Sequence, residues 1–137
     1  MHENKTMRNR ELMRDYRREL REAFENSTYE TREKLINGML AKSRPRFDVS
    51  YEYAVRMMNT MIRDGKPCPM RRPRKQAMWN EIREHVERIV NRRKCPIYKA
   101  VAIVLAEQTA SRYYLSYNQA SKILYHENRN RRSHSAN

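Results

Sequence analysis

Two stretches of the sequence match when the chain is shifted by 66 residues: RFDVSYEYAVRMM at residues 46–58 and RYYLSYNQASKIL at residues 112–124. Arg, Ser, Tyr and Ala are identical at four of these positions, and five further pairs keep their chemical type. The same shift, without gaps, aligns apolar residues of two earlier segments. These pairs are Met13 with Trp79, Tyr16 with Ile82, Leu20 with Val86, Ala23 with Ile89, Phe24 with Val90, Leu35 with Val101 and Met39 with Leu105. One register that matches three segments indicates a tandem duplication of a unit of about 55 residues.

Each copy contains three stretches in which apolar residues recur at helical spacing. We expect helices over about residues 7–25, 29–42 and 51–63 in the first copy, and about 75–92, 97–108 and 117–128 in the second. Ser50 and Ser116 stand at the N-caps of the third helices, and Gly65 ends the first of these. The sequence therefore predicts an all-α fold of about six helices, in two tandem three-helix units at residues 1–65 and 76–128.

The net charge of +14 is concentrated in two short segments. Residues 1–65 and 76–128 each carry a surplus of 3 positive charges. Residues 66–75 (KPCPMRRPRK) add 5 and residues 129–137 add 3, neither with any acid. Three prolines in the first segment predict an extended basic linker, and we expect the second to be a basic disordered tail.

The three helices of each copy resemble the helix-turn-helix class of DNA-binding modules, in which the third helix enters the major groove. The likeness covers both copies at class level, with a connection of about seven residues before the third helix where the class usually has three or four. It implies that Asn118, Gln119 and Lys122 contact bases and phosphates. In the first copy Glu52 would repel phosphate, so the second copy is the better candidate. The alternative is that these residues form ordinary solvated helix faces.

Arg46 and Arg112 are repeated, each directly before an aromatic residue. Such an arginine would hold a phosphate while Phe47 or Tyr113 packs beneath it. Alternatively, the aromatic ring fills the helical bundle and the arginine caps the carbonyl groups that end the second helix. The sequence leaves both interpretations open.

The basic segments are the strongest binding signal. Arg71, Arg72, Arg74 and Lys75 would follow a phosphate backbone or lie in a minor groove, and an import signal or a solubilising spacer is the alternative. The tail offers a second phosphate-binding arm. Its cations are Arg129, Arg131 and Arg132. Contact through both segments predicts affinity that falls steeply with salt.

No catalytic or cofactor-binding pattern is present, so we expect neither an enzyme nor a cofactor or small-molecule substrate. The four histidines are scattered, and the spacing of Cys68, Cys95 and His85 does not match a zinc-binding pattern. The carboxylates lie three or four residues from Arg or Lys, as solvated ion pairs do, with Glu11 and Asp15 as examples. We also expect a cytoplasmic protein without a membrane segment.

Two functions remain from the sequence. The first is a DNA-binding regulator or architectural protein, of a bacterium or a mobile element, with DNA favoured over RNA. The second is a helical adaptor or assembly subunit that binds nucleic acid non-specifically, an acidic protein partner, or another copy of itself.

Overall fold

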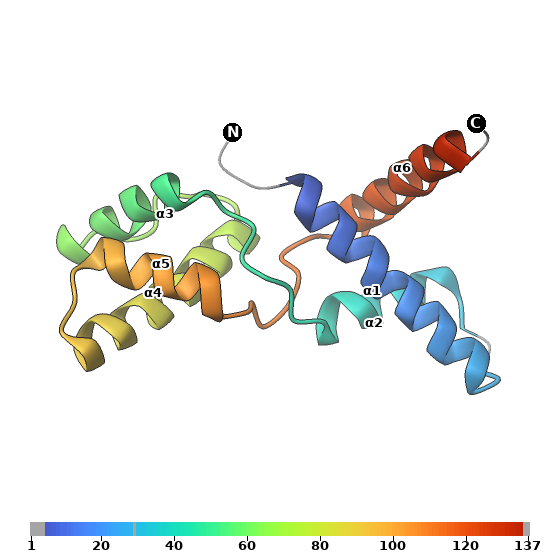
Figure 1. Cartoon of the computed structure of the whole chain (residues 1–137), viewed down its shortest axis with the longest axis horizontal. Coiled ribbons are helices and arrows are strands. Elements are labelled where there is room, and N and C mark those ends of the chain that lie inside the picture. Colours follow the sequence, from blue (N-terminus) through green and yellow to red (C-terminus); the bar gives the residue numbers. More distant parts are fainter. Residues whose placement is uncertain (1–4, 29, 136–137) are drawn as a thin grey trace. The chain divides into compact units, whose positions relative to one another are not determined.

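The fold is all-helical, as predicted. The structure is a computed structural model that describes residues 5–28 and 30–135, with side chains described up to residue 130. The helices are α1 (Lys5–Glu25), α2 (Arg32–Lys42), α3 (Tyr51–Met58), α4 (Pro73–Arg93), α5 (Ile97–Glu107) and α6 (Tyr117–Ser135), with a π-helical turn η1 (Asn59–Arg63) that continues α3 (Figure 1). Among these described residues an isolated antiparallel bridge joins Arg46 and Thr109, and no strand is present.

Local hydrogen bonds explain where the third helices begin. Ser50 Oγ accepts a hydrogen bond from Tyr53 N at 3.3 Å, and Ser116 Oγ accepts one from Gln119 N at 3.1 Å. The Gln119 side chain returns the bond, because its Oε1 accepts from Ser116 N at 2.9 Å. This reciprocal pair is a capping box, and both serines are N-caps as predicted. Gly65, with φ of +64°, ends the helical turn η1 in the left-handed conformation that glycine adopts without strain.

The helices group into two units, and this grouping does not follow the expected division at 1–65 and 76–128. Unit 1 consists of Arg46–Ala110 and contains α3, η1, α4 and α5. Unit 2 consists of Lys5–Pro45 together with the chain from Ser111 onward, and contains α1, α2 and α6. In Figure 1, α3 lies against α4 and α5, while α6 lies against α1 and α2. The two copies of the repeat have therefore exchanged their third helices.

The repeat itself is visible in the cores of both units. Residues 66 positions apart are buried in each unit. These pairs are Phe47 with Tyr113, Val49 with Leu115, Ala54 with Ala120, Met58 with Leu124, Met13 with Trp79 and Leu35 with Val101. Equivalent side chains thus fill equivalent positions, although each third helix completes the helix pair of the other copy.

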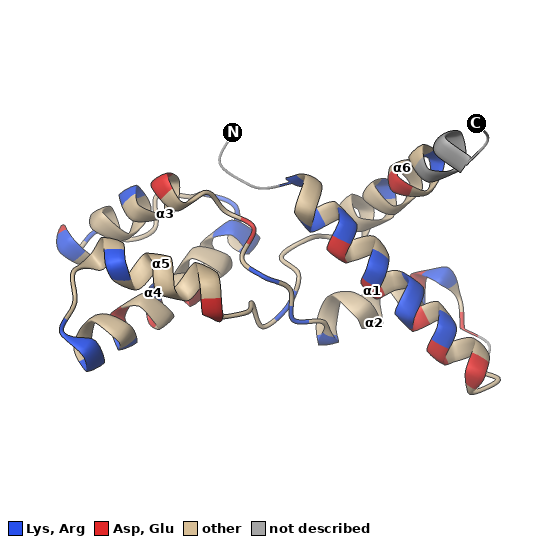
Figure 2. Ribbon diagram, viewed as in Figure 1, with Lys and Arg blue, Asp and Glu red and all other residues tan. Residues whose placement is uncertain are grey.

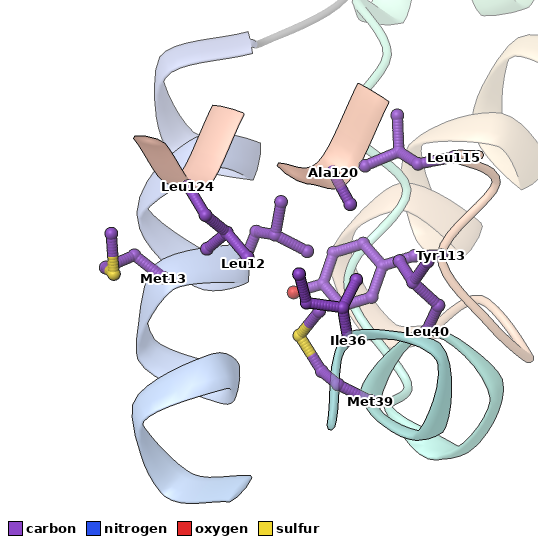
Figure 3. Packing of buried hydrophobic residues seen from close by; sticks show 9 residues of the cluster. All are labelled: Leu12, Met13, Ile36, Met39, Leu40, Tyr113, Leu115, Ala120 and Leu124. Carbon is purple, nitrogen blue, oxygen red and sulfur yellow. The ribbon is translucent and has the colours of Figure 1, made fainter. Parts of the chain in front are cut away.

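The core of unit 2 brings together α1, α2, α6 and the segment before α6 (Figure 3). Tyr113 lies among the apolar side chains of this cluster, and its backbone N donates to Leu40 O at 3.3 Å. Its hydroxyl donates to Asp15 Oδ2 at 2.7 Å, in a fully buried contact. Burial raises the pKa of Tyr113, and the hydrogen bond to the Asp15 carboxylate adds to the shift.

An acidic stripe on α1 faces this core, and here the expectation of solvated ion pairs is wrong. Glu11, Asp15 and Glu19 are one helical turn apart and all three are buried. Cations at the rim accompany two of them, since Arg18 Nη2 lies 3.1 Å from Asp15 Oδ1 and Lys42 Nζ lies 2.7 Å from Glu19 Oε1. This hydrogen bond to Glu19 raises the pKa of Lys42. Charge spacing in the sequence is the same for buried and exposed carboxylates, so it could not separate them.

Aromatic rings organise the core of unit 1. Trp79 of α4 is almost fully buried and meets the edge of Tyr53 of α3 with ring centroids 5.6 Å apart. Phe47, in the segment before α3, contacts His85 of α4 in the same way at 5.9 Å. Helix α3 and the segment before it are therefore anchored on α4 at these two points.

Both predicted basic segments contain more helix than expected. Helix α4 begins at Pro73, so residues 73–75 form its first turn, where proline fits because its missing N–H has no acceptor in the helix. Helix α6 continues to Ser135, so residues 129–135 extend the helix where we expected a disordered tail. Residues 136–137 lie outside the described residues.

Candidate nucleic-acid interface

The basic segment at residues 66–75 lies on unit 1. Residues 65–72 have no helical structure, and Lys66, Arg71, Arg72 and Arg74 are exposed. The Gln76 side chain of α4 holds the segment, because its Nε2 donates to Met70 O at 2.6 Å. Within the described part of the chain, none of these four cations forms an ion pair. Lys75 is half-buried and has contacts of its own.

The start of α4 adds to the positive potential of this segment. Arg72 occupies the N-cap without a side-chain cap, and the first turn contains no acidic residue. Backbone N–H groups at a helix N-terminus carry a partial positive charge that attracts anions. Three exposed arginines beside such a terminus form a surface suited to phosphate groups.

The outer face of α6 carries most of the predicted base-contacting residues. Asn118, Lys122, Tyr125 and Arg129 are all exposed and lie at helical spacing along one stripe. Gln119 is also exposed, but its side-chain oxygen accepts the Ser116 N–H of the capping box. Gln119 therefore has a structural role that sequence reasoning did not anticipate. The side chains of Arg131 and Arg132 lie outside the described residues.

The repeated arginines are exposed, whereas the rings that follow them are buried. Phe47 and Tyr113 are buried in the cores of units 1 and 2 respectively, as the second interpretation of these pairs required. Arg46 is exposed, and its backbone pairs with Thr109. Arg112 is exposed too, and its guanidinium carbon lies 5.6 Å from the ring centroid of Tyr114. Its Nε donates to Tyr113 O at 3.4 Å, so this arginine does not cap α2.

The exchange of helices changes the helix-turn-helix interpretation. In that class a short turn joins the second helix to the third. Here α2 leads into α3, which packs in unit 1, while the helix that packs beside α2 is α6. The outer face of α6 is accordingly presented by a three-helix unit whose second and third helices are distant in sequence.

Lys and Arg residues are spread over the helices of both units (Figure 2), and the predicted site residues divide between the units. Residues 46–110 carry 14 basic and 7 acidic groups, and residues 5–45 with 111–137 carry 16 and 8. Unit 1 holds Arg46, Arg71, Arg72, Arg74 and Lys75. Unit 2 holds Arg112, Asn118, Gln119, Lys122 and Arg129. The structure thus presents two surfaces, each of which is described on its own unit.

Sequence reasoning missed a further cluster of cations in unit 1. Arg92, Arg93 and Lys94 end α4, and Lys99 lies in the first turn of α5, all of them exposed. The signal was present in the sequence, since residues 88–106 contain five basic residues and no acid. The near balance of charge over residues 76–128 as a whole concealed it.

The described residues offer little for metal or thiol chemistry. Cys68 and Cys95 are free thiols, and over residues 5–28 and 30–135 no three His, Cys, Asp or Glu side chains gather as metal ligands would. None of the described helices combines the length and apolar character that a membrane span requires. Comparison of the chain with protein-family models, with curated proteins and with solved structures yields no match.

Proposed function

We propose that this chain is a non-enzymatic nucleic-acid-binding protein that holds duplex DNA through its phosphates. The observation that carries the proposal is the exposed segment around Arg71, Arg72 and Arg74, which lacks counterions in the described chain and lies at an uncapped helix N-terminus. Three arginines without carboxylate partners keep their charge available for phosphate. Each contact would release condensed counterions and so favour binding at low salt.

The stripe on α6 supports contact with bases as well as phosphates. Asn118 offers an amide that pairs with adenine, and Lys122 and Arg129 offer donors for guanine or phosphate. A helix enters the major groove of B-form DNA but not the deep, narrow major groove of A-form RNA. This difference favours DNA over RNA as the partner.

The test is duplex binding by Arg71→Ala/Arg72→Ala/Arg74→Ala, titrated at several salt concentrations. Loss of three phosphate contacts would lower the slope of log affinity against log salt by about 2.7. Between about 50 and 200 mM salt, the unsubstituted protein would then lose roughly 40-fold more affinity than the variant. The matched control is Arg21→Ala/Arg32→Ala/Lys34→Ala, which removes the same charge from exposed positions of unit 2. Equal effects of the two triple variants would refute a localised phosphate site.

A second experiment distinguishes contact with bases from contact with phosphates. If α6 contacts bases, Asn118→Ala/Lys122→Ala reduces the preference among duplex sequences. If the protein is an adaptor that binds nucleic acid non-specifically, Asn118→Ala/Lys122→Ala leaves binding unchanged. Only Arg71→Ala/Arg72→Ala/Arg74→Ala then weakens it.

One observation favours the adaptor as the second candidate function. Phe24 is 86% exposed and Leu20 is 42% exposed, although both belong to the apolar pattern of α1. Their repeat equivalents on α4 are better covered, since Val86 is fully buried and Val90 is half-buried. Exposed large apolar side chains of this kind are common at protein interfaces. Absence of nucleic-acid binding at low salt would leave a protein partner as the better explanation.

A further inference from the structure

The corner where α4 ends and α5 begins combines exposed cations with exposed aromatic rings. Arg92, Arg93, Lys94 and Lys99 are exposed, and none forms an ion pair within the described part of the chain. Tyr98 precedes Lys99 in the first turn of α5 and is 57% exposed. Tyr51 of α3 is 40% exposed and reaches the same place, because its hydroxyl donates to Tyr98 O at 3.4 Å. We call these six residues the α4–α5 corner.

Helix α5 begins at the corner without a side-chain cap. Lys94 adopts a left-handed conformation with φ of +52°, which reverses the chain between the two helices. Pro96 is the N-cap of α5 and supplies no side-chain acceptor for the first N–H groups of that helix. The first turn of α5 contains no acidic residue. Arg92, Arg93 and Lys94 lie at the negative end of α4, whereas Lys99 lies at the positive end of α5, where a cation does not stabilise the helix.

Core packing does not account for the exposed ring of Tyr98. Its repeat equivalent is Arg32, an exposed residue at the start of α2, so the fold does not need an apolar side chain at this position. The repeat equivalent of Tyr51 is Tyr117, which is half-buried in unit 2. An aromatic residue that the fold neither requires nor buries is available to a ligand.

We propose that the α4–α5 corner binds single-stranded DNA, with a base stacked on Tyr98 and the neighbouring phosphates on the four cations. Exposed rings set among cations are the usual composition of single-strand binding surfaces. The ring can stack only on a base that is free of its own stack, so duplex DNA cannot use it. An acidic protein segment would use the cations but gains less from the rings.

The corner is distinct from the basic segment that we assign to duplex DNA. The two lie at opposite ends of α4, whose 21 residues span about 30 Å. This distance corresponds to roughly nine base pairs of duplex. One unit would therefore contact a duplex at one end of α4 and an unpaired strand at the other. That combined use rests on the proposed function, whereas single-strand binding at the corner does not.

The experiment measures binding of the full chain to a fluorescein-labelled oligothymidylate of about 12 nucleotides, long enough for one such site. Tyr98→Ala is expected to weaken this binding roughly 10-fold or more and to leave duplex binding unchanged. The matched control is Phe24→Ala, because Phe24 is an exposed ring, 86% exposed, that lies on α1. Circular dichroism spectra of both variants should match that of the unsubstituted protein, since both side chains are at the surface.

A second variant reports stacking directly. Tyr98→Trp should retain single-strand binding, and the fluorescence that it adds to that of buried Trp79 should be quenched when the oligonucleotide binds. Unquenched fluorescence at saturation, or equal binding by Tyr98→Ala and Phe24→Ala, would overturn the proposal. Single-strand binding that only Arg71→Ala/Arg72→Ala/Arg74→Ala weakens would do the same. Loss of duplex binding in that triple variant tests the proposed function separately.

Discussion

The hydrogen bond between Tyr113 and Asp15 allows a direct test of the helix exchange. Tyr113 precedes α6 in the second copy of the repeat, and Asp15 belongs to α1 in the first. Their side chains meet only because α6 packs with α1 and α2. In an arrangement without exchange, Phe47 would occupy the place of Tyr113 and would offer Asp15 no hydroxyl. We therefore predict that Tyr113→Phe and Asp15→Ala are energetically coupled.

The magnitude follows from the burial of the contact. The Tyr113 hydroxyl and Asp15 Oδ2 are 2.7 Å apart, and both residues are almost completely buried. A hydrogen bond to a charged acceptor contributes about 1.5 to 3 kcal/mol, so Tyr113→Phe should cost about 2 kcal/mol of unfolding free energy. Arg14 and Arg18 also lie near Asp15, but their side chains are 68% and 49% exposed and compensate little. The double variant should be less destabilised than the sum of the single variants by about 1 to 2 kcal/mol.

Urea unfolding of the two single variants and the double variant measures this coupling. Far-ultraviolet circular dichroism reports both units, while the fluorescence of Trp79, the only tryptophan, reports unit 1. The control is Phe47→Leu, since Phe47 holds the position in unit 1 that Tyr113 holds in unit 2. Its cost should add to that of Asp15→Ala within about 0.5 kcal/mol. If the costs of Tyr113→Phe and Asp15→Ala also add within this margin, the two side chains are not in contact and the exchange of helices is wrong.

Two further predictions concern stability. The pKa of Tyr113 is raised in the folded chain, so above a pH of about 10 the unfolded chain loses this proton while the folded chain keeps it, and the free energy of unfolding should fall by about 1.4 kcal/mol per pH unit. Tyr113→Phe should remove this part of the decline, measured by urea unfolding from about pH 9 to 11. Equal declines in the variant and the unsubstituted protein would contradict this prediction. Ser50→Ala and Ser116→Ala should each cost about 1 kcal/mol, with the loss at Ser50 seen in Trp79 fluorescence and that at Ser116 in circular dichroism; a neutral effect of either substitution would exclude the cap.

Only part of the candidate site could be predicted from the sequence. The exposed arginines at residues 66–75 could be predicted, because a Pro-rich stretch without acids has no helix face to bury them. Asn118 and Lys122 were predicted on the outer face of the third helix and are both exposed, whereas the capping role of Gln119 depends on a bond to the backbone of Ser116. The α4–α5 corner was missed, since it is formed by a chain reversal at Lys94 and by Tyr51, which is distant in sequence.

The helices and their cores follow from local properties of the chain. Apolar spacing, the serines at the N-caps and Gly65 specify each helix from neighbouring residues, and several pairs in the 66-residue register are buried in both units, among them Phe47 with Tyr113 and Ala54 with Ala120. Local properties do not determine which helix pair each third helix packs against. Because the two copies present equivalent apolar faces, either third helix satisfies the pattern of either pair. Tertiary structure makes the choice through specific contacts, and the buried pairing of Tyr113 with Asp15 is one that Phe47 cannot replace.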